Sequence, residues 1–404
     1  MRVAFTLLGG AGWTGGRNYL RNLLSSIALA SGPRVEPVLF TGTDVPESEL
    51  AELRPLLASP PFPTPLWNRA ARGIRFTRSL LLQRDRAAEE LYRDAGIDLV
   101  FQHSAWHGLR FGLPTLAWIA DFQHRSLPGM FSWENWLRRE AGYWGLSRSA
   151  TALLLSSEDA RRACERFYPS SRGRTEVLPF AVGVPEAWSD DVAGCRARHA
   201  LPERYLYMPN QFWKHKNHAA AVEAMRILVS RHPDLVLVMS GALVDGRHPG
   251  HPREILAAIQ RTGLQRSCRV LGVIPYGDVL TLARGAVAVV NPSFSEGWST
   301  TVEEAKTLGT PLVLSDLAVH REQVETKALF FDPRSPEAMA EAMAKAWTAG
   351  EIARPARDQV RVRARERMAR FGEGFGRIAQ DTVARFGERS RNASGSPARE
   401  VGHG

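Results

Sequence analysis

Short apolar runs alternate with longer amphipathic or polar stretches along almost the whole chain, and this alternation restricts the fold more than any other feature. In the first half the apolar runs are 3–8, 35–40, 99–102, 116–120, 152–155 and 176–180. Each run is followed by a turn and a candidate helix. Strands that alternate with helices are typical of a parallel sheet covered by helices on both faces. The sequence therefore predicts an α/β fold with a doubly wound parallel sheet.

The alternation stops after Gly183 and then starts again. Residues 184–203 are polar without a sustained period, which indicates a linker. The second series of expected strands is 205–208, 235–239, 269–273, 287–290, 312–314 and 329–331, with helices such as 219–230 and 336–347 between them. The chain has 404 residues, more than one hydrophobic core usually supports. We expect two Rossmann-like domains, at 1–183 and 204–370.

The C-terminal part of the chain has a different composition. Residues 371–388 are helical in composition, and we expect a helix there that packs back on the N-terminal domain. From Arg389 the sequence is small, polar and rich in Gly and Ser, so 389–404 is predicted to be a disordered tail.

Composition argues against several classes of protein. Cys164, Cys195 and Cys268 form no CxxC pair and no Cys/His cluster with zinc-ligand spacing, which argues against a disulfide framework or a structural metal. The start of the sequence lacks a secretory apolar region, and no run approaches the ~20 apolar residues of a membrane span. We therefore expect a cytoplasmic protein without a metal ion.

The net charge of +10 has a local source in the N-terminal half. Residues 66–86 hold six Arg and one Asp, interleaved with apolar side chains such as Trp67, Ile74 and Phe76. Such a segment can lie peripherally on an anionic membrane surface. A second aromatic and basic stretch, at 133–144, lies in the same half. The alternative is a core helix with a solvated basic face, and the sequence leaves both open.

The strongest chemical signal is SFSEGWSTTVEEAKTLGTPLVLSD. A loop with Glu296 and Gly297 follows an expected strand, and a helix opens near Thr300, which can form a capping box with Glu303. The start of such a helix is an anion site suited to a diphosphate, and Gly297 permits close approach. With Glu304 one turn into the helix, two carboxylates flank one pocket. The alternative is an ordinary turn with solvated glutamates.

These residues resemble a known family. Glu296 and Glu304 match the E-x7-E motif of retaining glycosyltransferases with the GT-B fold, and the likeness continues through 309–311 and 331–333 over most of 204–345. It implies two domains that face each other across a cleft, the acceptor bound by the first and a nucleotide-sugar donor by the second. It implies that Glu296 contacts the donor sugar and Glu304 the ribose. The diphosphate would contact the backbone of Gly297, Trp298, Ser299 and Thr300.

A second signal is YLYMPNQFWKHKNHAAAVEA, a strand, a loop and a helix. Lys216 lies at the junction, where a compact charge suits a phosphate. The family usually reads G-R-x4-K here. Lys216 matches the Lys, but Asn210 and Gln211 stand in place of Gly and Arg, which removes one positive charge. A neighbouring Lys or His or a more distant Arg could compensate, and we favour a subgroup that uses Asn-Gln.

Two further places in the N-terminal half match the family in part. Asp121 and His124 follow an expected strand, at the edge where ligands bind in open α/β sheets. Asp121 matches the Asp of the family's H-D pair, whereas Ala120 replaces the His, so His124 is the nearest substitute. Gly15 and Gly16 match a Gly-Gly pair that lies beside the donor phosphate, with a plain tight turn as the alternative.

The resemblance implies retaining transfer of a hexosyl unit from a nucleotide diphosphate sugar to a saccharide or lipid-linked saccharide in polysaccharide biosynthesis. Lys216 and the helix start would stabilise the departing charge, without a metal or another cofactor. The alternatives are a nucleotide-sugar epimerase of the same fold and a catalytically silent protein that binds saccharide or nucleic acid. Glu296, Glu304 and Lys216 together favour the enzyme, and we expect no nucleic-acid partner.

Overall fold

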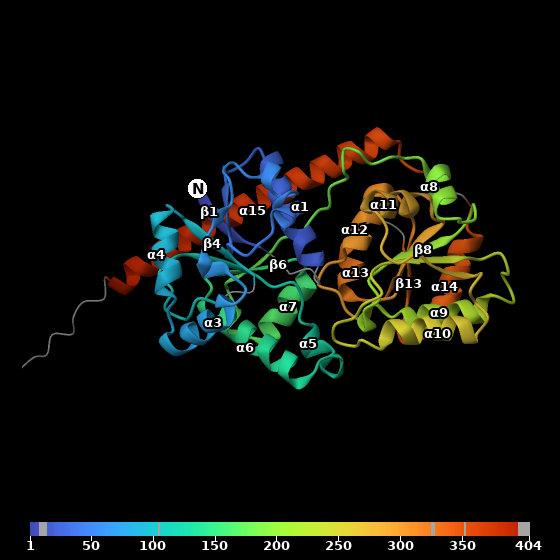
Figure 1. Ribbon diagram of the computed structural model, residues 1–404, viewed down its shortest axis with the longest axis horizontal. Helices are drawn as coiled ribbons and strands as arrows, with labels where there is room; N and C mark the ends of the chain where they lie inside the picture. Colours follow the sequence, from blue (N-terminus) through green and yellow to red (C-terminus); the bar gives the residue numbers. More distant parts are fainter. Residues whose placement is uncertain (8–13, 104–105, 325–327, 351–352, 395–404) are drawn as a thin grey trace, which may run out of the picture.

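The computed structural model describes residues 1–7, 14–103, 106–324, 328–350 and 353–394. In these ranges the chain forms two α/β domains that lie side by side, with one long helix running along both (Figure 1). One sheet has seven strands and the other six, and all the strand pairs are parallel. The predicted pair of doubly wound parallel sheets is confirmed.

The N-terminal sheet has the order β3-β2-β1-β4-β5-β6-β7. Its strands are β1 (Arg2–Thr6), β2 (Glu36–Thr41), β3 (Phe62–Pro63), β4 (Leu99–Gln102), β5 (Thr115–Trp118), β6 (Ala152–Leu155) and β7 (Thr175–Val177). Its helices are α1 (Thr14–Leu29), α2 (Glu47–Leu50), α3 (Ala71–Leu82), α4 (Arg86–Asp94), α5 (Gln123–Ser126), α6 (Trp133–Ser149) and α7 (Glu158–Phe167), with 3-10 turns η1 (Arg54–Leu56), η2 (Pro65–Trp67), η3 (Pro128–Met130) and η4 (Pro169–Ser171).

Helices on both faces explain why the central strands are continuously apolar. Along β5 and just beyond it, Leu116 and Trp118 pack into the core beneath α1, whereas Ala117 and Ile119 pack into the core beneath α6 and α7. Successive side chains of a strand point to opposite faces, so a sheet covered on both faces needs apolar residues at every position.

The C-terminal sheet has the order β10-β9-β8-β11-β12-β13. Its strands are β8 (Leu206–Pro209), β9 (Leu237–Ser240), β10 (Cys268–Val270), β11 (Ala288–Asn291), β12 (Leu312–Ser315) and β13 (Leu329–Phe331). The remaining elements are α8 (Val192–Arg198), η5 (Lys214–Lys216), α9 (His218–Leu228), α10 (His251–Arg261), α11 (Tyr276–Gly285), α12 (Thr300–Leu308), α13 (Ala318–Gln323), α14 (Pro336–Thr348) and α15 (Arg357–Ser394).

The cores of the two domains change over at Gly183. Phe180 and Val182 pack into the N-terminal core, whereas Val184 and Trp188 pack with the C-terminal one. The segment 184–203, expected to be an irregular linker, contains α8. This helix forms because Asp191 caps its start, accepting a hydrogen bond from the Gly194 N–H at 2.8 Å, and because Cys195 is buried against the C-terminal core.

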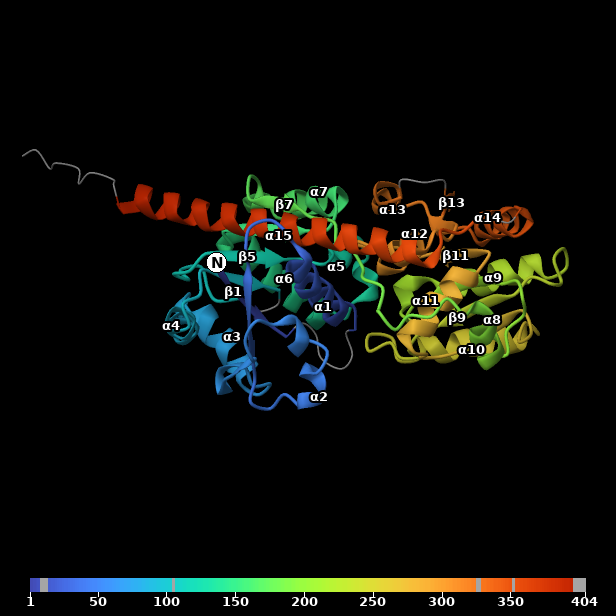
Figure 2. The ribbon, with the colours of Figure 1, turned by 90° about the horizontal axis from the view of Figure 1, so that it is seen from above.

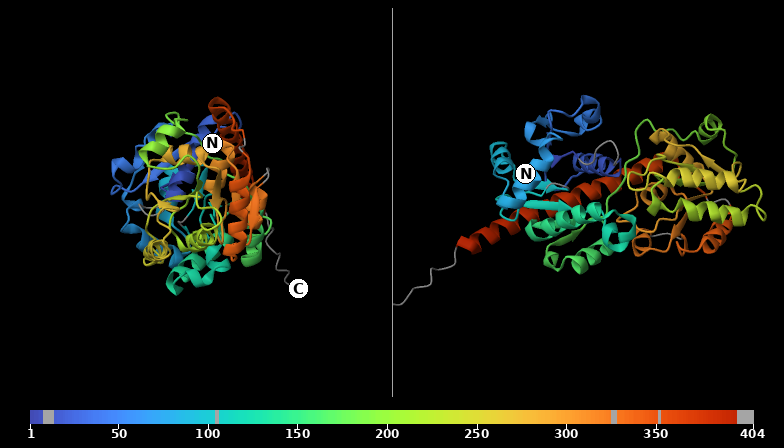
Figure 3. Two further views of the ribbon diagram at one scale, coloured as in Figure 1. Left: turned by 90° about the vertical axis from the view of Figure 1, so that its right-hand side faces the viewer. Right: turned by 60° about the horizontal axis from the view of Figure 1, so that its bottom comes forward.

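The helix α15 begins in the C-terminal domain and runs back along the N-terminal one (Figures 2 and 3). Val360 belongs to the C-terminal core, whereas Phe371 and Phe375 belong to the N-terminal core. A Cβ at Gly372 would lie 2.0 Å from the Ser26 carbonyl oxygen, so the backbones of α15 and α1 are in direct contact. Only glycine permits this approach.

The predicted start of disorder at Arg389 is wrong, because α15 continues to Ser394. A helix that is already formed adds each further residue at little cost, so a polar sequence can extend it without packing of its own. The rest of the expected tail, 395–404, lies outside the described residues.

Candidate active site

The loop that follows β11 packs directly against the loop that follows β5, so the carboxyl ends of the two sheets meet. A Cβ at Gly297 would lie 1.8 Å from the Ala120 carbonyl oxygen. Ser157 Oγ donates to the Gly297 carbonyl at 2.9 Å, and Trp298 Nε1 donates to the Phe180 carbonyl at 3.1 Å. The close approach that requires Gly297 is therefore made by the N-terminal backbone, and Trp298 binds the same domain.

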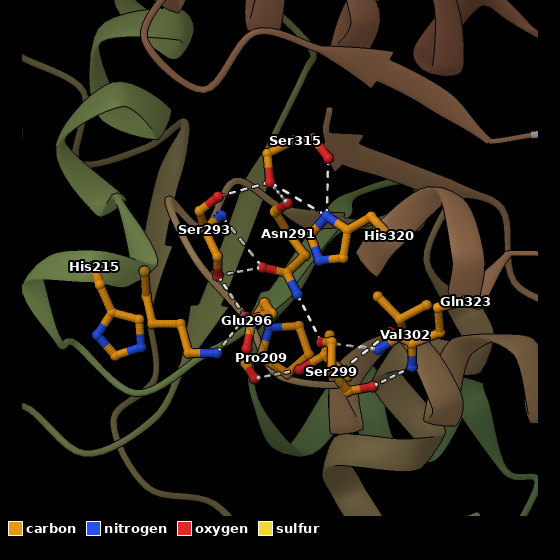
Figure 4. Close-up of polar contacts among 12 residues, drawn as sticks. Pro209, His215, Asn291, Ser293, Glu296, Ser299, Val302, Ser315, His320 and Gln323 are labelled. Atoms are coloured by element: carbon orange, nitrogen blue, oxygen red, sulfur yellow. Dashed lines mark hydrogen bonds and ion pairs between the residues drawn. The ribbon is translucent and has the colours of Figure 1, made fainter. Parts of the chain in front are cut away.

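A buried ion pair joins two of the predicted residues. Lys216 Nζ lies 2.6 Å from Glu296 Oε1, with side chains 14% and 8% exposed. Ser293 Oγ lies 2.6 Å from the same carboxylate oxygen (Figure 4). Asn217, at φ 61°, ends η5 and donates to the Pro292 carbonyl at 3.2 Å, which holds η5 against the loop of Glu296. The cation and the carboxylate are thus held together before any ligand binds.

The start of α12 differs from the predicted capping box. The cap is Ser299, whose Oγ accepts from the Val302 N–H at 3.4 Å, and Thr300 is the first helical residue. The Ser299 N–H donates to Gln323 Oε1 at 3.1 Å, and Gln323 Nε2 donates back to the Ser299 carbonyl at 2.7 Å (Figure 4). The Ser299 N–H is thus already bonded to a side chain. Thr300 and Thr301, at the start of α12, line a pocket.

A pocket of about 210 Å³ lies between α1 and the carboxyl ends of β8, β9 and β11. Its lining comes from both domains and includes Gly15, Asn18, Asn210, Gln211, Trp213, Lys216, Ser240, Gly241, Tyr276, Thr300, Thr301 and Glu304. Six of the predicted residues meet here: Gly15, Asn210, Gln211, Lys216, Thr300 and Glu304. Gly16, Glu296, Gly297, Trp298 and Ser299 are not among its lining residues. Of the glycine-rich segment before α1, residues 9–13 lie outside the described residues.

Glu304 is a buried residue that lines this pocket. Burial raises the pKa of Glu304 to about 7, although a hydrogen bond from Tyr276 Oη at 2.9 Å and the charge of Arg21 act in the opposite direction. The Arg21 guanidinium, on α1, lies 5.4 Å from the centre of the Tyr276 ring. Near neutral pH this carboxyl is therefore shared between its protonated and ionised forms. The sequence did not point to Tyr276 or Arg21.

The Asn-Gln pair braces the loop that follows β9. Gln211 Oε1 accepts from the Ala242 N–H at 2.8 Å, and a Cβ at Gly241 would lie 2.3 Å from the Asn210 carbonyl oxygen. An arginine of this loop reaches back to the site. Arg247 Nη2 lies 3.2 Å from Nδ1 of His215, and its guanidinium lies 4.8 Å from the centre of the Phe131 ring of the N-terminal domain. Arg247 is not among the residues that line the 210 Å³ pocket, but it lies beside His215, the neighbour of Lys216 in the chain.

Asp121 and His124 occupy two different environments. Asp121 accepts from Arg139 Nη1 at 3.1 Å, and this guanidinium holds the pKa of the carboxyl below its usual value in spite of burial. His124 is fully buried, with Nε2 3.0 Å from Tyr168 Oη and 3.2 Å from Glu140 Oε2. Neither residue is among those that line the 210 Å³ pocket. His124 lies in the core between α5, α6 and α7, which corrects the expectation that it lines the donor site.

A cluster outside this pocket could in principle hold a metal ion. Ligand atoms of Cys195, His199 and Asp278 lie within 4.8 Å of one another. The Asp278 carboxylate already pairs with Arg198 at 2.7 Å and His199 at 2.8 Å, and burial raises the pKa of the Cys195 thiol to about 11. These contacts fit an ion-pair network at the start of α11, with a protonated thiol, better than a cation site.

The comparisons with known proteins agree with this geometry. Residues 196–367 match the family described as glycosyl transferases group 1. The D-inositol 3-phosphate glycosyltransferase of Corynebacterium urealyticum is 24% identical over 184 residues, which cover 44% of this chain and 39% of that protein. The chain thus spans well under half the length of this curated relative.

Solved structures cover almost the whole chain. A glycosyltransferase of Rickettsia africae superposes with a TM-score of 0.62 and 13% identity, over 97% of this chain and 99% of the other. HepE of Anabaena in complex with UDP-glucose superposes with a TM-score of 0.61 and 14% identity, over 98% and 100%. These likenesses show the fold. The chain therefore has the GT-B fold, and its residues 196–367 are similar to the glycosyl transferases group 1.

Proposed function

We propose that the protein is a retaining glycosyltransferase that moves a hexosyl unit from a nucleotide diphosphate sugar to a hydroxyl of a saccharide or lipid-linked saccharide in polysaccharide biosynthesis. The observation that carries this proposal is the pocket in which Lys216, Glu304 and the start of α12 converge, with Glu296 held 2.6 Å from Lys216. HepE, a protein of similar fold, is solved with UDP-glucose, which makes UDP-sugars the first donors to test.

Each part of the pocket suits one part of the donor. Departure of the nucleotide diphosphate develops negative charge, which Lys216 and the positive end of the α12 dipole stabilise. Glu304 suits the ribose, because a carboxylate accepts hydrogen bonds from hydroxyl groups. Glu296 suits the hydroxyls of the donor sugar, with its carboxylate oriented by Lys216 and Ser293. No step of this account needs a metal ion.

A second pocket supports an acceptor site in the N-terminal domain. It has a volume of about 120 Å³ at the carboxyl ends of β1, β2 and β4, and its lining includes Trp67, Arg75, Phe76, His103 and Trp106. The Arg75 guanidinium lies 3.8 Å from the centre of the Trp67 ring and pairs with Asp85 at 2.7 Å. Aromatic faces with a few oriented polar groups suit a small saccharide unit.

The surface next to this pocket supports contact with an anionic membrane. On α3 and α6 the large side chains of Ile74, Leu80, Leu81, Leu82, Trp133, Leu137 and Trp144 are exposed, beside exposed Arg78, Arg86, Arg138 and Arg148. Trp106 connects the two helices, with its ring 6.4 Å from Phe76 and in contact with Gly145. The exposed apolar face of α3 favours the membrane-surface interpretation over a core helix.

The membrane contact proposed here is peripheral. Within the described ranges the structure contains no helix whose length and apolar character would let it cross a bilayer.

The test of the proposed function is a two-stage donor experiment. Thermal shift against UDP-, GDP- and ADP-sugars identifies the donor, because a ligand that binds the folded state raises its melting temperature. Transfer to a saccharide acceptor is then followed by NMR of the anomeric centre, and we expect retention. Inversion would refute the retaining mechanism. Donor conversion without acceptor would identify an epimerase, and binding without any conversion would identify a silent binding protein.

A further inference from the structure

A third and larger cavity lies at the opposite end of the C-terminal sheet from the donor pocket. Its volume is about 850 Å³, and its lining includes Ala286 and Val287 just before β11, Pro311 and Leu312 at the start of β12, and Leu329 at the start of β13. The donor pocket lies at the carboxyl ends of β8, β9 and β11. The two cavities are therefore separated by the length of the strands, and the reaction does not use the larger one.

The lining of this cavity is strongly basic. Five cationic side chains line it, Arg196, Arg204, Arg284, Lys345 and Arg354, against two carboxylates, Asp190 and Glu203. Asp190 is already paired with Arg284. Arg284 and Arg354 line the same cavity, and burial and then the charge of Arg284 lower the pKa of Arg354, as is expected when two cations lie close together away from water. A bound anion relieves this repulsion.

Two of these arginines carry buried N–H groups without a partner. The Arg284 side chain is only 10% exposed. Its Nε donates to Asp190, and its Nη2 donates to the Pro355 carbonyl at 2.9 Å. Its Nη1 has no hydrogen-bond partner among the described residues. Nε of Arg196 is likewise buried without a hydrogen-bond partner in the described part of the chain. An unsatisfied buried donor costs about 1–3 kcal/mol. Two of them beside one basic cavity point to a polar ligand.

Two other cations are held in fixed positions. Arg354 donates to the Gly309 carbonyl at 2.8 Å and to the Ala286 carbonyl at 2.6 Å. Arg204 donates to the Trp347 carbonyl at 2.7 Å and lies 4.5 Å from the centre of the Trp347 ring. Guanidinium groups that are already oriented lose little conformational entropy when they bind a phosphate.

We propose that this cavity, at the amino ends of β8, β11, β12 and β13, binds a small phosphorylated metabolite whose phosphate contacts the cationic side chains of the lining. The volume is within the range of small-molecule sites, and planar guanidinium groups match phosphate oxygens in pairs. The lining is drawn from distant parts of the chain, since Asp190 belongs to the segment that leads into α8 and Arg354 to the one that leads into α15.

The test uses inorganic pyrophosphate as the probe in isothermal titration calorimetry with the full chain. Pyrophosphate can also enter the donor pocket, so the titration is repeated with Lys216→Ala. We expect one binding event that survives in Lys216→Ala and weakens at least about tenfold in an Arg204→Ala/Lys345→Ala variant, because that variant removes two charge-assisted hydrogen bonds to the probe. The control is Arg253→Ala/Arg266→Ala, which removes two exposed cations elsewhere and should bind as the wild type does.

Three outcomes overturn the proposal: no binding to the wild type, no event that survives in Lys216→Ala, or an equal loss of affinity in the control variant. Circular dichroism checks that each variant is folded. If Arg204→Ala/Lys345→Ala does not fold, Lys345→Glu replaces it. Among the described residues the Lys345 ammonium has no hydrogen bond like the one that Arg204 makes to the Trp347 carbonyl. The experiment measures binding, so its result does not depend on whether the glycosyltransferase assays succeed.

Discussion

Lys216 Nζ and Glu296 Oε1 lie 2.6 Å apart although 80 positions separate the two residues in the chain. The pair brings the loop after β8 to the loop after β11, and both side chains are largely buried. A buried charge that loses its partner is strongly destabilised, so each member of this pair holds the other in place. The geometry makes Lys216 and Glu296 one unit, so the roles proposed for them depend on each other.

Replacement of either member should abolish most of the activity. Under the proposed function, Lys216→Ala would remove the cation that stabilises the departing diphosphate. Glu296→Gln would remove the carboxylate that positions the lysine and the donor sugar. We expect kcat to fall about 10²- to 10³-fold in each, a magnitude typical of losing one electrostatic contact to the transition state. The control is Lys214→Ala, which removes an exposed cation two residues away. Wild-type turnover in Lys216→Ala would show that Lys216 does not stabilise the departing diphosphate.

The stability of the protein should depend on the ionisation of Glu304. Its pKa is raised from 4.5 to about 7, so the protonated form stabilises the folded state, and this stabilisation is lost as the pH rises from about 5 through 7. The melting temperature of the wild type should therefore fall, relative to that of Glu304→Gln, between pH 5 and pH 8. Parallel melting curves for the two proteins would rule out the raised pKa.

The hydrogen bond from Tyr276 should also affect the pH dependence of the melting temperature. It lowers the pKa of Glu304 by favouring the ionised form. Tyr276→Phe should therefore move the pH-dependent fall in melting temperature to a higher pH. A shift to lower pH would mean that Tyr276 does not donate to this carboxyl.

Gly297→Ala should separate the two domains. The new methyl group would lie 1.8 Å from the Ala120 carbonyl oxygen, a backbone atom that cannot rotate away. Overpacking of this kind costs about 1–3 kcal/mol, and we expect a larger radius of gyration by small-angle scattering together with at least about a tenfold loss of kcat/KM. Gly246→Ala is the matched control, since its Cβ would meet no atom within 4 Å. Equal behaviour of the two variants would show that the domains do not pack at Gly297.

Arg247 should contribute to donor binding. Gln211 is uncharged and is hydrogen-bonded to Ala242, whereas the Arg247 guanidinium lies 3.2 Å from His215, next to Lys216 in the chain. We expect Arg247→Ala to raise the donor KM about tenfold, as the loss of one charge-assisted contact would. Arg253→Ala, which changes an exposed arginine of α10, should leave KM unchanged. An unaltered KM in Arg247→Ala would show that another group replaces the missing charge.

The α3–α6 surface should bind vesicles that contain anionic lipid. Leu81 and Trp133 are 75% and 72% exposed, and we expect Leu81→Glu/Trp133→Glu to abolish sedimentation with such vesicles, because it replaces inserted apolar groups by charges that the membrane repels. Val244→Glu, at a valine of the C-terminal domain that is 66% exposed, is the control. Sedimentation that is the same with neutral and anionic vesicles would exclude the basic residues from the contact.

The sequence alone determined the two parallel sheets and the places of Lys216, Glu296 and Glu304. Each of these residues follows an apolar run, and the carboxyl ends of parallel strands lie at one edge of a sheet, so local pattern was enough to bring them together. The strand β3 escaped prediction because a two-residue edge strand that contains Pro63 has no periodicity to detect.

Only the tertiary structure decided which groups complete the site. Gly297 meets Ala120 and Arg21 lies over Tyr276 because the two domains dock in an orientation that no local pattern encodes. His124 is buried because α6 and the segment after α7 pack over it within the N-terminal domain. The basic cavity at the other end of the C-terminal sheet arises in the same way, from arginines of α8, α11 and the segment before α15 that are distant in the chain. The hydrophobic period of a helix or strand indicates which of its faces is buried. The contacts that it makes with other elements depend on how distant parts of the chain pack.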